Sequence, residues 1–253
     1  MSLVFVTNKK ESQKLKVPLE KIRGRQPVTS NEQYALRRLI NTSDGSHTIY
    51  VPEIDEHFHS IHGAVQESAF IYIVNGFDYC KADPLSILEV GFGTGLNALL
   101  TAVKSMAGSR EVNYTSMEIQ PLGNKIIKSL NHYQFAGEHG REIFQLIHSS
   151  PWNTNVNICK KFNLKKIETD FTKVKLSGKY DLIYFDAFGP DKQPEMWTKE
   201  LFGGIASVTN KNGVLVTYSA KGEVRRSLKE SGFFVTLIPG PPGKRQMIRA
   251  VKI

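Results

Sequence analysis

The chain is poor in cysteine and has no long apolar run. Only Cys80 and Cys159 occur among its 253 residues, and neither belongs to a C-x-x-C pair. This scarcity argues against a disulfide-stabilised fold and a cysteine-ligated zinc site, and it favours a reducing, cytoplasmic compartment. No apolar run approaches the ~20 residues of a membrane-spanning helix, so we expect no transmembrane segment.

Several other signatures are also missing. The first ten residues carry no charged leader ahead of an apolar stretch, so no secretory signal is expected. The sequence has neither internal repeats nor a low-complexity tract. His57, His59 and His62 lie close together, but their spacing is not that of a metal site. We interpret them as surface or helix-capping residues and expect no metal.

The net charge of +9 is concentrated at the two ends of the chain. Residues 1–26 contain seven Lys/Arg against two Glu, and residues 221–253 contain eight against two, whereas the middle is nearly balanced. Basic ends around a neutral body indicate a polyanionic partner, with nucleic acid the first choice. Solubilising surface lysines explain the charge equally well. A membrane partner is not expected, because the basic N-terminal segment lacks an apolar amphipathic face.

The weak periodicity of the first fifty residues predicts two parts. Residues 1–50 are expected to be a basic N-terminal extension, and residues 51–253 a single α/β domain. From Ile54 to Asp78 the apolar residues recur at spacings compatible with a helix that leads into a sheet.

Residues 87–100 are the most informative segment. A short apolar run suited to a buried strand ends in glycines at alternate positions, and apolar residues then recur at helical spacing from Leu96. Strand, glycine turn and helix together predict the nucleotide-binding start of a doubly wound, Rossmann-like α/β sheet. A glycine turn with no ligand is the alternative interpretation.

The spacing of this turn is Glu89-x-Gly91-x-Gly93-x-Gly95, which differs from the G-x-G-x-x-G of dinucleotide sites. A carboxylate at this point repels a pyrophosphate but accepts a hydrogen bond from an ammonium or hydroxyl group. S-adenosylmethionine carries an amino-acid group and a sulfonium but no phosphate. The turn therefore resembles motif I of class I methyltransferases, which use S-adenosylmethionine.

A second acid closes the next predicted strand. Residues 112–118 read as a strand that ends in Glu118, and this carboxylate lies 23 residues past Gly95. A doubly wound fold places an acid there to bind ribose hydroxyls. A helix-capping role is the alternative, and the order of elements favours the ribose interpretation.

Two further predicted strands also end in acids. The strand at 162–171 ends in Asp170 and Phe171, which can bond to adenine and stack on it, or simply begin a polar loop. The strand at 180–186 ends in Asp186, at the edge where doubly wound sheets bind ligands.

The last third of the chain predicts the end of the sheet. Residues 213–218 read as a strand and residues 223–231 as a helix. Residues 233–238 and 247–253 flank a turn rich in proline and glycine and read as a closing hairpin. Such a pair matches the reversed last strand of class I methyltransferases.

Four segments together resemble one family. They are residues 87–100, 186–197, 217–226 and 242–247, which occur in the same order in the methyltransferase half of the bifunctional tRNA wobble-uridine enzymes of the MnmC family. The D-A-F-x-P-x-K-x-P-E-M-W and G-K-R-x-M pieces are far more specific than the glycine turn. The resemblance implies methyl transfer from S-adenosylmethionine to the 5-aminomethyl group of 2-thiouridine at tRNA position 34.

The resemblance also indicates which parts of the bifunctional enzymes to expect. No second glycine fingerprint occurs in the chain, so the FAD-dependent oxidase half and its flavin are not expected. We expect a stand-alone methyltransferase, with oxidase activity supplied by separate proteins and a tRNA substrate that already carries the free amine.

The resemblance and the strand positions assign roles to individual residues. Asp186 is expected to hold the acceptor ammonium, orient it and accept its proton, and Phe188 to stack on the flipped wobble base. The predicted cofactor-binding residues are Glu89, Gly91, Gly93, Thr94, Gly95, Asn97, Glu118, Asp170 and Phe171. The predicted RNA phosphate contacts are Lys221, Arg225, Arg226, Lys244 and Arg245.

Two other functions compete with this interpretation. One is a class I enzyme that transfers a methyl or aminopropyl group to a small amine, which does not need basic ends and is insensitive to salt. The other is an RNA-binding module that retains an inactive cofactor fold, although a binding scaffold has no need of acids at three strand ends. Binding of S-adenosylmethionine separates the second alternative from both enzymes.

Overall fold

A small sheet precedes the central domain. The computed structural model describes residues 37–253. Residues 1–36 of the basic extension predicted at residues 1–50 therefore lie outside the described residues. Its remainder contributes to an antiparallel sheet of three strands, β1 (Arg38–Asn41), β2 (His47–Val51) and β3 (Glu56–His57). The boundary predicted at residue 50 falls inside β2, and Ile49 of this strand is 1% exposed.

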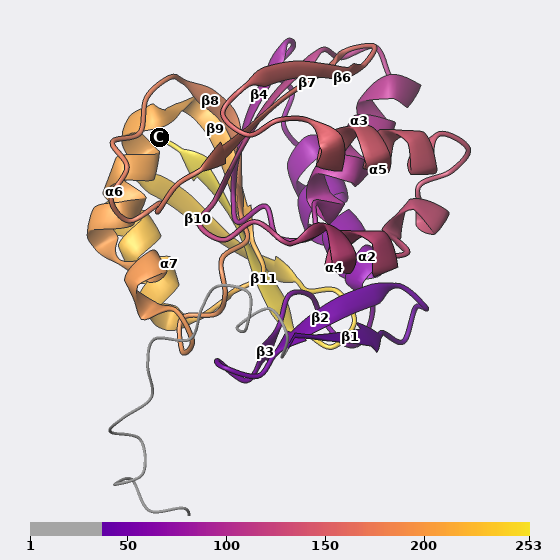
Figure 1. The fold of residues 1–253 in the computed structure, drawn as a ribbon. Coiled ribbons are helices and arrows are strands. Elements are labelled where there is room, and N and C mark those ends of the chain that lie inside the picture. Colours follow the sequence, from indigo (N-terminus) through magenta and orange to yellow (C-terminus); the bar gives the residue numbers. More distant parts are fainter. Residues whose placement is uncertain (1–36) are drawn as a thin grey trace, which may run out of the picture. The chain divides into compact units, whose positions relative to one another are not determined.

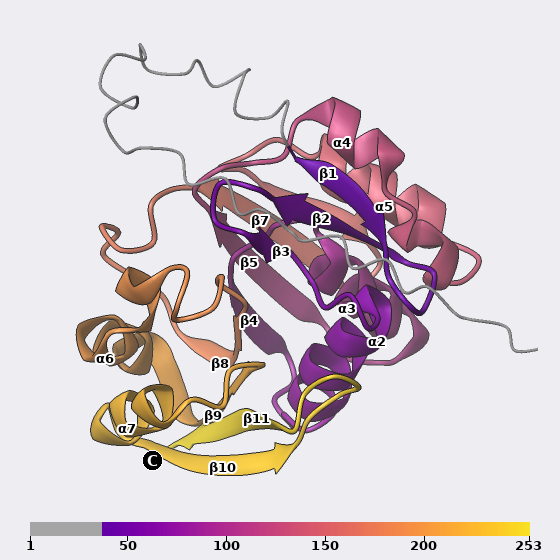
Figure 2. The same ribbon diagram turned by 90° about the horizontal axis from the view of Figure 1, so that it is seen from below.

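Eight strands form the central sheet, in the order β10-β11-β9-β8-β4-β5-β7-β6 (Figures 1 and 2). The parallel strands are β4 (Leu85–Val90), β5 (Val112–Glu118), β7 (Phe162–Glu168), β8 (Tyr180–Phe185) and β9 (Thr209–Thr217). The edges are completed by β6 (Asn155–Cys159), β10 (Phe233–Pro239) and β11 (Gln246–Lys252). Strand β11 runs antiparallel to β9, which confirms the predicted doubly wound sheet with a reversed last strand.

Helices cover both faces of this sheet (Figure 1). One face carries α3 (Leu96–Ala107), α5 (Gly140–Ser149) and the π-helix η3 (Ala69–Phe77), and the other carries α6 (Lys199–Val208) and α7 (Gly222–Glu230). The shorter helices are α2 (Ala64–Ser68), α4 (Asn124–Ser129), η4 (His132–Phe135) and η5 (Pro194–Trp197). Within residues 37–253, no helix has the length and apolar character needed to cross a bilayer.

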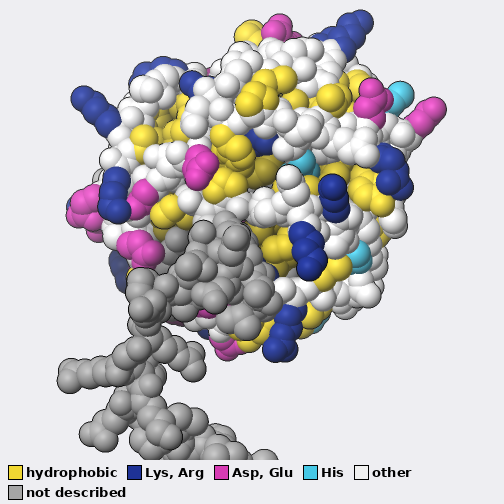
Figure 3. Space-filling model, viewed as in Figure 1, with side chains coloured by type: hydrophobic (Ala, Val, Ile, Leu, Met, Phe, Trp, Pro, Cys, Tyr) yellow, Lys and Arg dark blue, Asp and Glu magenta, His cyan; other side chains and the backbone are white. Residues whose placement is uncertain are grey.

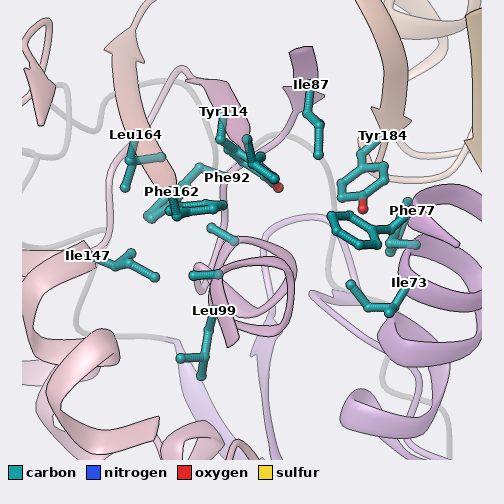
Figure 4. Close-up of a cluster of buried hydrophobic side chains, with 14 of the residues drawn as sticks. Ile73, Phe77, Ile87, Phe92, Leu99, Tyr114, Ile147, Phe162, Leu164 and Tyr184 are labelled. Atoms are coloured by element: carbon teal, nitrogen blue, oxygen red, sulfur yellow. The ribbon is translucent and has the colours of Figure 1, made fainter. Parts of the chain in front are cut away.

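The larger apolar cluster lies between the sheet and the α3–α5 face (Figure 4). Tyr114 of β5 and Phe162 and Leu164 of β7 pack with Leu99 of α3 and Ile147 of α5. Side chains alternate between the two faces of a strand, so Val112 and Tyr114 of β5 and Phe162 and Leu164 of β7 enter this cluster together. The same alternation places the polar residues Glu118 of β5 and Lys166 of β7 near Gly93 of the glycine turn.

Most predicted elements are present. The strand at 112–118 has the predicted bounds, and the closing hairpin is formed by β10 and β11. The helix predicted between Ile54 and Asp78 begins only at Ala64, because residues 56–57 pair with β2 instead.

The π-helix η3 packs unusually close to the sheet. The N–H of Asp78 donates to the carbonyl oxygen of Ile73 (2.8 Å), five residues earlier, as a π-helix requires. A Cβ atom at Gly76 would lie 3.0 Å from the Tyr184 ring and 3.1 Å from Val216. The absence of a side chain at this position therefore lets the helix approach β8 and β9.

The surface of the described residues mixes apolar and basic side chains. Figure 3 shows hydrophobic side chains gathered near the middle of one face, with Lys and Arg side chains spread around them. Such a mixture suits a ligand that presents both flat apolar groups and negative charge.

Candidate active site

The glycine turn between β4 and α3 packs closely against its neighbours. Gly91, Gly93 and Gly95 have φ values of +91°, +50° and +71°, a region that glycine adopts at no steric cost. A Cβ atom at Gly91 would lie 2.7 Å from the carbonyl oxygen of Asp186. Because neither conformation nor space allows a side chain there, glycine at position 91 is what lets the turn pack directly against the end of β8.

Glu89 lies completely buried beneath this turn. The hydroxyl of Ser116 donates to its Oε2 (2.5 Å), while its Oε1 has no hydrogen-bond partner among the described residues. Burial raises the pKa of Glu89 to about 8, and the negative charge of Asp186 adds to this increase. The charge state of Glu89 is therefore linked to that of Asp186. Its bond to the cofactor stays a prediction.

Glu118 stands at the end of β5, beside the glycine turn. Its Oε2 accepts from the N–H of Gly93 (2.9 Å), and its Oε1 accepts from the N–H of Gln120 (2.9 Å). These two bonds fix the carboxylate at the point predicted for the ribose contact.

Asp170 and Phe171 follow β7, the next strand along the sheet. Asp170 pairs with Lys173 (2.8 Å) and accepts from the hydroxyl of Thr172 (2.7 Å), and these bonds lower its pKa to about 2. Phe171 is 7% exposed and packs in the cluster under α6 and α7. Their contact with adenine stays a prediction.

Asp186 occupies the predicted place directly after β8. Its Oδ2 accepts a hydrogen bond from the side-chain amide of Asn97 (2.8 Å), at the start of α3. Burial raises the pKa of Asp186 to about 6, while Tyr72 and Asn97 offset part of the increase. The Tyr72 hydroxyl lies near enough to Asp186 to lower the pKa of that carboxyl. A half-buried carboxylate that ionises near neutral pH is suited to holding an ammonium group and taking its proton.

Phe188 meets a residue that the sequence did not single out. Its ring packs edge-on against Phe58 (centroids 5.3 Å apart), and a Cβ atom at Gly93 would lie 3.0 Å from the same Phe58 ring. Phe58 therefore lies between the glycine turn and the loop after Asp186. No periodicity or motif marks Phe58, since it follows β3 in an irregular segment.

Comparison with known proteins gives the family. Residues 144–253 match the family model described as S-adenosyl-L-methionine-dependent methyltransferase. The crystal structure of MNMC2 from Aquifex aeolicus superposes with a TM-score of 0.70 at 28% identity, covering 85% of this chain and 70% of that one. These matches identify the chain as an S-adenosyl-L-methionine-dependent methyltransferase.

Curated relatives align with the methyltransferase over most of its length. The tRNA 5-methylaminomethyl-2-thiouridine biosynthesis bifunctional protein MnmC of Campylobacter hominis is 30% identical over 65% of this chain, and that of Cupriavidus metallidurans is 30% identical over 82%. These alignments cover 25% and 33% of the two relatives. The chain therefore spans about a quarter to a third of the length of the relatives that it matches.

His59 of the methyltransferase is not the surface or capping residue that the sequence predicted. Its Nε2 lies 2.7 Å from the hydroxyl of Thr94, and burial lowers its pKa to about 4. From the other side, His148 of α5 places its Nε2 3.2 Å from the Thr94 carbonyl oxygen, and burial lowers its pKa to about 4. Two neutral histidines thus hold Thr94, whose side chain faces the protein interior. Within residues 37–253 no group of His, Cys, Asp or Glu is placed to bind a metal ion.

A small cavity adjoins the glycine turn of the methyltransferase. It has a volume of about 60 Å³, and its walls include Gly93, Trp152 and Lys166. The buried Lys166 ammonium donates to the carbonyl oxygen of Ile147 (2.7 Å), and burial lowers its pKa to about 8. The volume suits a few water molecules, and Lys166 serves to satisfy the C-terminal carbonyls of α5.

The basic residues predicted to contact RNA lie at one edge of the sheet. They follow β9 or lie in the β10–β11 turn: Lys221, Arg225, Arg226, Lys244 and Arg245. Ile248 of β11 is opposite Thr217 of β9, so both segments meet at the edge that carries the glycine turn and Asp186. Arg226 and Arg245 are exposed, whereas Lys221 and Lys244 form ion pairs with Asp191 and Glu67.

Replacing Glu89 with glutamine is expected to stabilise the ligand-free methyltransferase at high pH. The Glu89 carboxyl has a pKa of about 8 in the folded protein and 4.5 in an ordinary environment. It therefore leaves the free energy of unfolding unchanged below pH 4.5 and lowers it progressively as the pH rises to 8. The melting temperature of Glu89→Gln should therefore match wild type at pH 4.5 and exceed it increasingly up to pH 8. Thermal unfolding at several pH values measures this, with the exposed Glu138→Gln as control. A constant difference across that window contradicts the expectation.

Proposed function

We propose that the chain transfers a methyl group from S-adenosylmethionine to the 5-aminomethyl group of wobble uridine 34 in tRNA, giving 5-methylaminomethyl-2-thiouridine. The observation that carries this proposal is Asp186, a half-buried carboxylate next to the glycine turn whose pKa is raised to about 6. The names of the MnmC relatives state biosynthesis of this nucleoside, and they support the choice of substrate.

The residues present fit S-adenosylmethionine. Asn97 Oδ1, at the start of α3 after the glycine turn, is buried and has no hydrogen-bond partner among the described residues, so it is available to a bound ligand. Glu118 is held at the strand end where ribose hydroxyls bind in doubly wound sheets. When bound, S-adenosylmethionine supplies a methyl carbon whose bond to the sulfonium breaks as a nucleophile bonds to it.

Asp186 prepares the acceptor nitrogen. A simple alkylamine with a pKa near ~10 is protonated at neutral pH, and only its neutral form is a nucleophile. Ionised Asp186 binds the ammonium, orients it, and accepts its proton directly or through water. Most of the acceleration is expected from positioning, because the methyl donor is already activated.

Aromatic side chains next to Asp186 suit an unpaired base. Phe188 and Phe58 form an edge-to-face pair beside the glycine turn. Bases of an anticodon loop are unpaired and readily stack on such rings. We propose that Phe188 stacks on the wobble base while Phe58 supports it.

The partners follow from the same proposal. The proposed reaction needs a tRNA that already carries the free amine, and we propose that separate proteins supply it. The methyltransferase uses no flavin and acts in the cytoplasm, where its tRNA substrate is found.

Nucleoside mass spectrometry tests the function directly. The purified protein is mixed with S-adenosylmethionine and tRNA from a strain blocked at the free aminomethyl stage. We expect the wobble nucleoside to gain the mass of one methyl group. Binding of S-adenosylmethionine without this gain would place the acceptor elsewhere, and methyl or aminopropyl transfer to small amines would be assayed next. Failure to bind S-adenosylmethionine would favour the RNA-binding module.

Removing Arg225 and Arg226 is expected to weaken tRNA binding without affecting the cofactor. Each arginine that contacts a phosphate adds about one unit to the slope of log K against log salt. The double alanine variant should therefore raise the KM for tRNA and reduce this slope by up to about 2. Filter binding at several salt concentrations measures the slope, with Lys179→Ala on the α6 side as control. An unchanged slope would exclude both arginines as phosphate contacts.

A further inference from the structure

Glu67 is a nearly buried carboxylate that joins separate parts of the chain. It lies in α2 and is 8% exposed. Its Oε2 accepts from the N–H of Ser60 (2.8 Å), and its Oε1 lies 3.2 Å from the Nζ of Lys244 in the β10–β11 turn. A carboxylate at this depth needs a cation, because an unpaired buried charge is strongly destabilising. Lys244 supplies that cation.

Lys244 also contacts Tyr218, which is hydrogen-bonded to the residue that follows Asp186. Its ammonium lies 4.6 Å from the centroid of the Tyr218 ring, within the range of a cation–π interaction. The Tyr218 hydroxyl donates to the carbonyl oxygen of Ala187 (2.8 Å), the residue that follows Asp186. Through Tyr218, the Glu67–Lys244 pair is therefore connected to the loop that begins at Asp186.

Both members of the pair act on the charge of Asp186. The carboxylate of Glu67 raises the pKa of Asp186, and the ammonium of Lys244 lowers it. The other polar groups that act on Asp186 or respond to it come from η3, β4, α3, β5 and the end of β9: Tyr72, Glu89, Asn97, Tyr114 and Tyr218. Lys244 is the cation among these groups, so it competes with an incoming acceptor ammonium for the same carboxylate.

We propose that Glu67 is a positioning residue that holds Lys244 away from Asp186 and so keeps the acceptor carboxylate free for the substrate amine. This inference rests on the proposed function and deepens it. Lys244 then belongs to the acceptor site and is not a phosphate contact. The G-K-R-x-M segment serves to bring that lysine over Tyr218 and onto Glu67.

The test compares pH profiles of Glu67→Gln and Lys244→Met. Methyl transfer to tRNA requires ionised Asp186, so kcat/KM falls as the pH drops through the Asp186 pKa. Glu67→Gln removes a negative charge and frees the lysine, which moves this acid limb to lower pH and raises the KM for the acceptor. Lys244→Met moves the limb to higher pH. The double variant falls between them, with a KM nearer to wild type than that of Glu67→Gln.

A second measurement needs no substrate. The side-chain carboxyl of Asp186 is titrated by carbon-13 NMR in the ligand-free protein, and the two single variants are expected to shift its midpoint in opposite directions. Glu230→Gln and Lys199→Met, which break an exposed ion pair of the same type, should change neither the profile nor the midpoint. Shifts in the same direction, or none, overturn the proposal. If Lys244→Met instead reduces the salt dependence of tRNA binding, Lys244 is a phosphate contact and the proposal is also overturned. Failure of the wild-type protein to methylate tRNA would overturn the proposed function and leave the NMR result to decide this inference.

Discussion

Replacing Asp186 with asparagine is expected to reduce methyl transfer to tRNA by about 10²–10⁴-fold, the usual contribution of a general base. Asparagine keeps the size of the side chain and can still accept a hydrogen bond from Asn97, but it neither attracts an ammonium nor takes its proton. Binding of S-adenosylmethionine should change little, because the glycine turn and Glu118 remain intact. Single-turnover transfer and calorimetric binding measure the two effects.

The pH dependence of the wild-type enzyme belongs to the same expectation. Activity should fall below pH ~6, because Asp186 has a pKa of about 6 and must be ionised to hold the amine. Glu138→Gln, which alters an exposed carboxylate in the turn before α5, is the control and should keep near-normal activity. Full activity of Asp186→Asn would sink the assignment of the base.

The second large effect is expected from Gly91→Ala. The new Cβ atom would lie 2.7 Å from the backbone carbonyl oxygen of Asp186, and the φ of +91° is unfavourable for alanine. Because the contacted atom belongs to the backbone, the clash is relieved only by moving the turn or the end of β8. We expect a loss of about 1–3 kcal/mol in the free energy of unfolding and at least about tenfold weaker binding of S-adenosylmethionine.

A control for this substitution is available in α6. Nothing lies within 4 Å of a Cβ atom at Gly203, which occupies the interior of that helix. Gly203→Ala should therefore raise the free energy of unfolding by up to about 1 kcal/mol through helix propensity alone. Urea denaturation and calorimetry on both variants separate the two effects. Normal cofactor affinity in Gly91→Ala would show that the turn does not cradle the ligand.

The sequence predicted the parts of the site that depend on local pattern. The glycine turn, Glu118 at the end of β5 and Asp186 at the end of β8 follow from strand periodicity and from the rule that parallel strands bring their carboxyl ends to one edge. These residues need only the order of the elements along the chain to be placed correctly. The reversed last strand was predictable for the same reason.

The segment before the first parallel strand could not be predicted in this way. Phe58, His59 and Glu67 enter the site from a connection that has only a two-residue strand and one short helix. Their roles arise from contacts with Gly93, Thr94 and Lys244, which lie 35 or more positions away in the sequence. No spacing rule encodes such contacts. The interpretation of His59 as a surface residue was wrong because burial here is imposed by tertiary packing.

Because η3 is a π-helix, the position of Tyr72 beside Asp186 depends on the number of residues in this helix. Five-residue hydrogen bonding in this helix accommodates a residue that an α-helix of the same span would exclude. Tyr72 lies on it near Asp186, and Gly76 fixes how near the helix stands to β8. Deleting a single residue between them would turn the Tyr72 side of the helix relative to the sheet while leaving its hydrophobic composition nearly unchanged. The length of this helix therefore matters as much to the acceptor site as the identity of its residues.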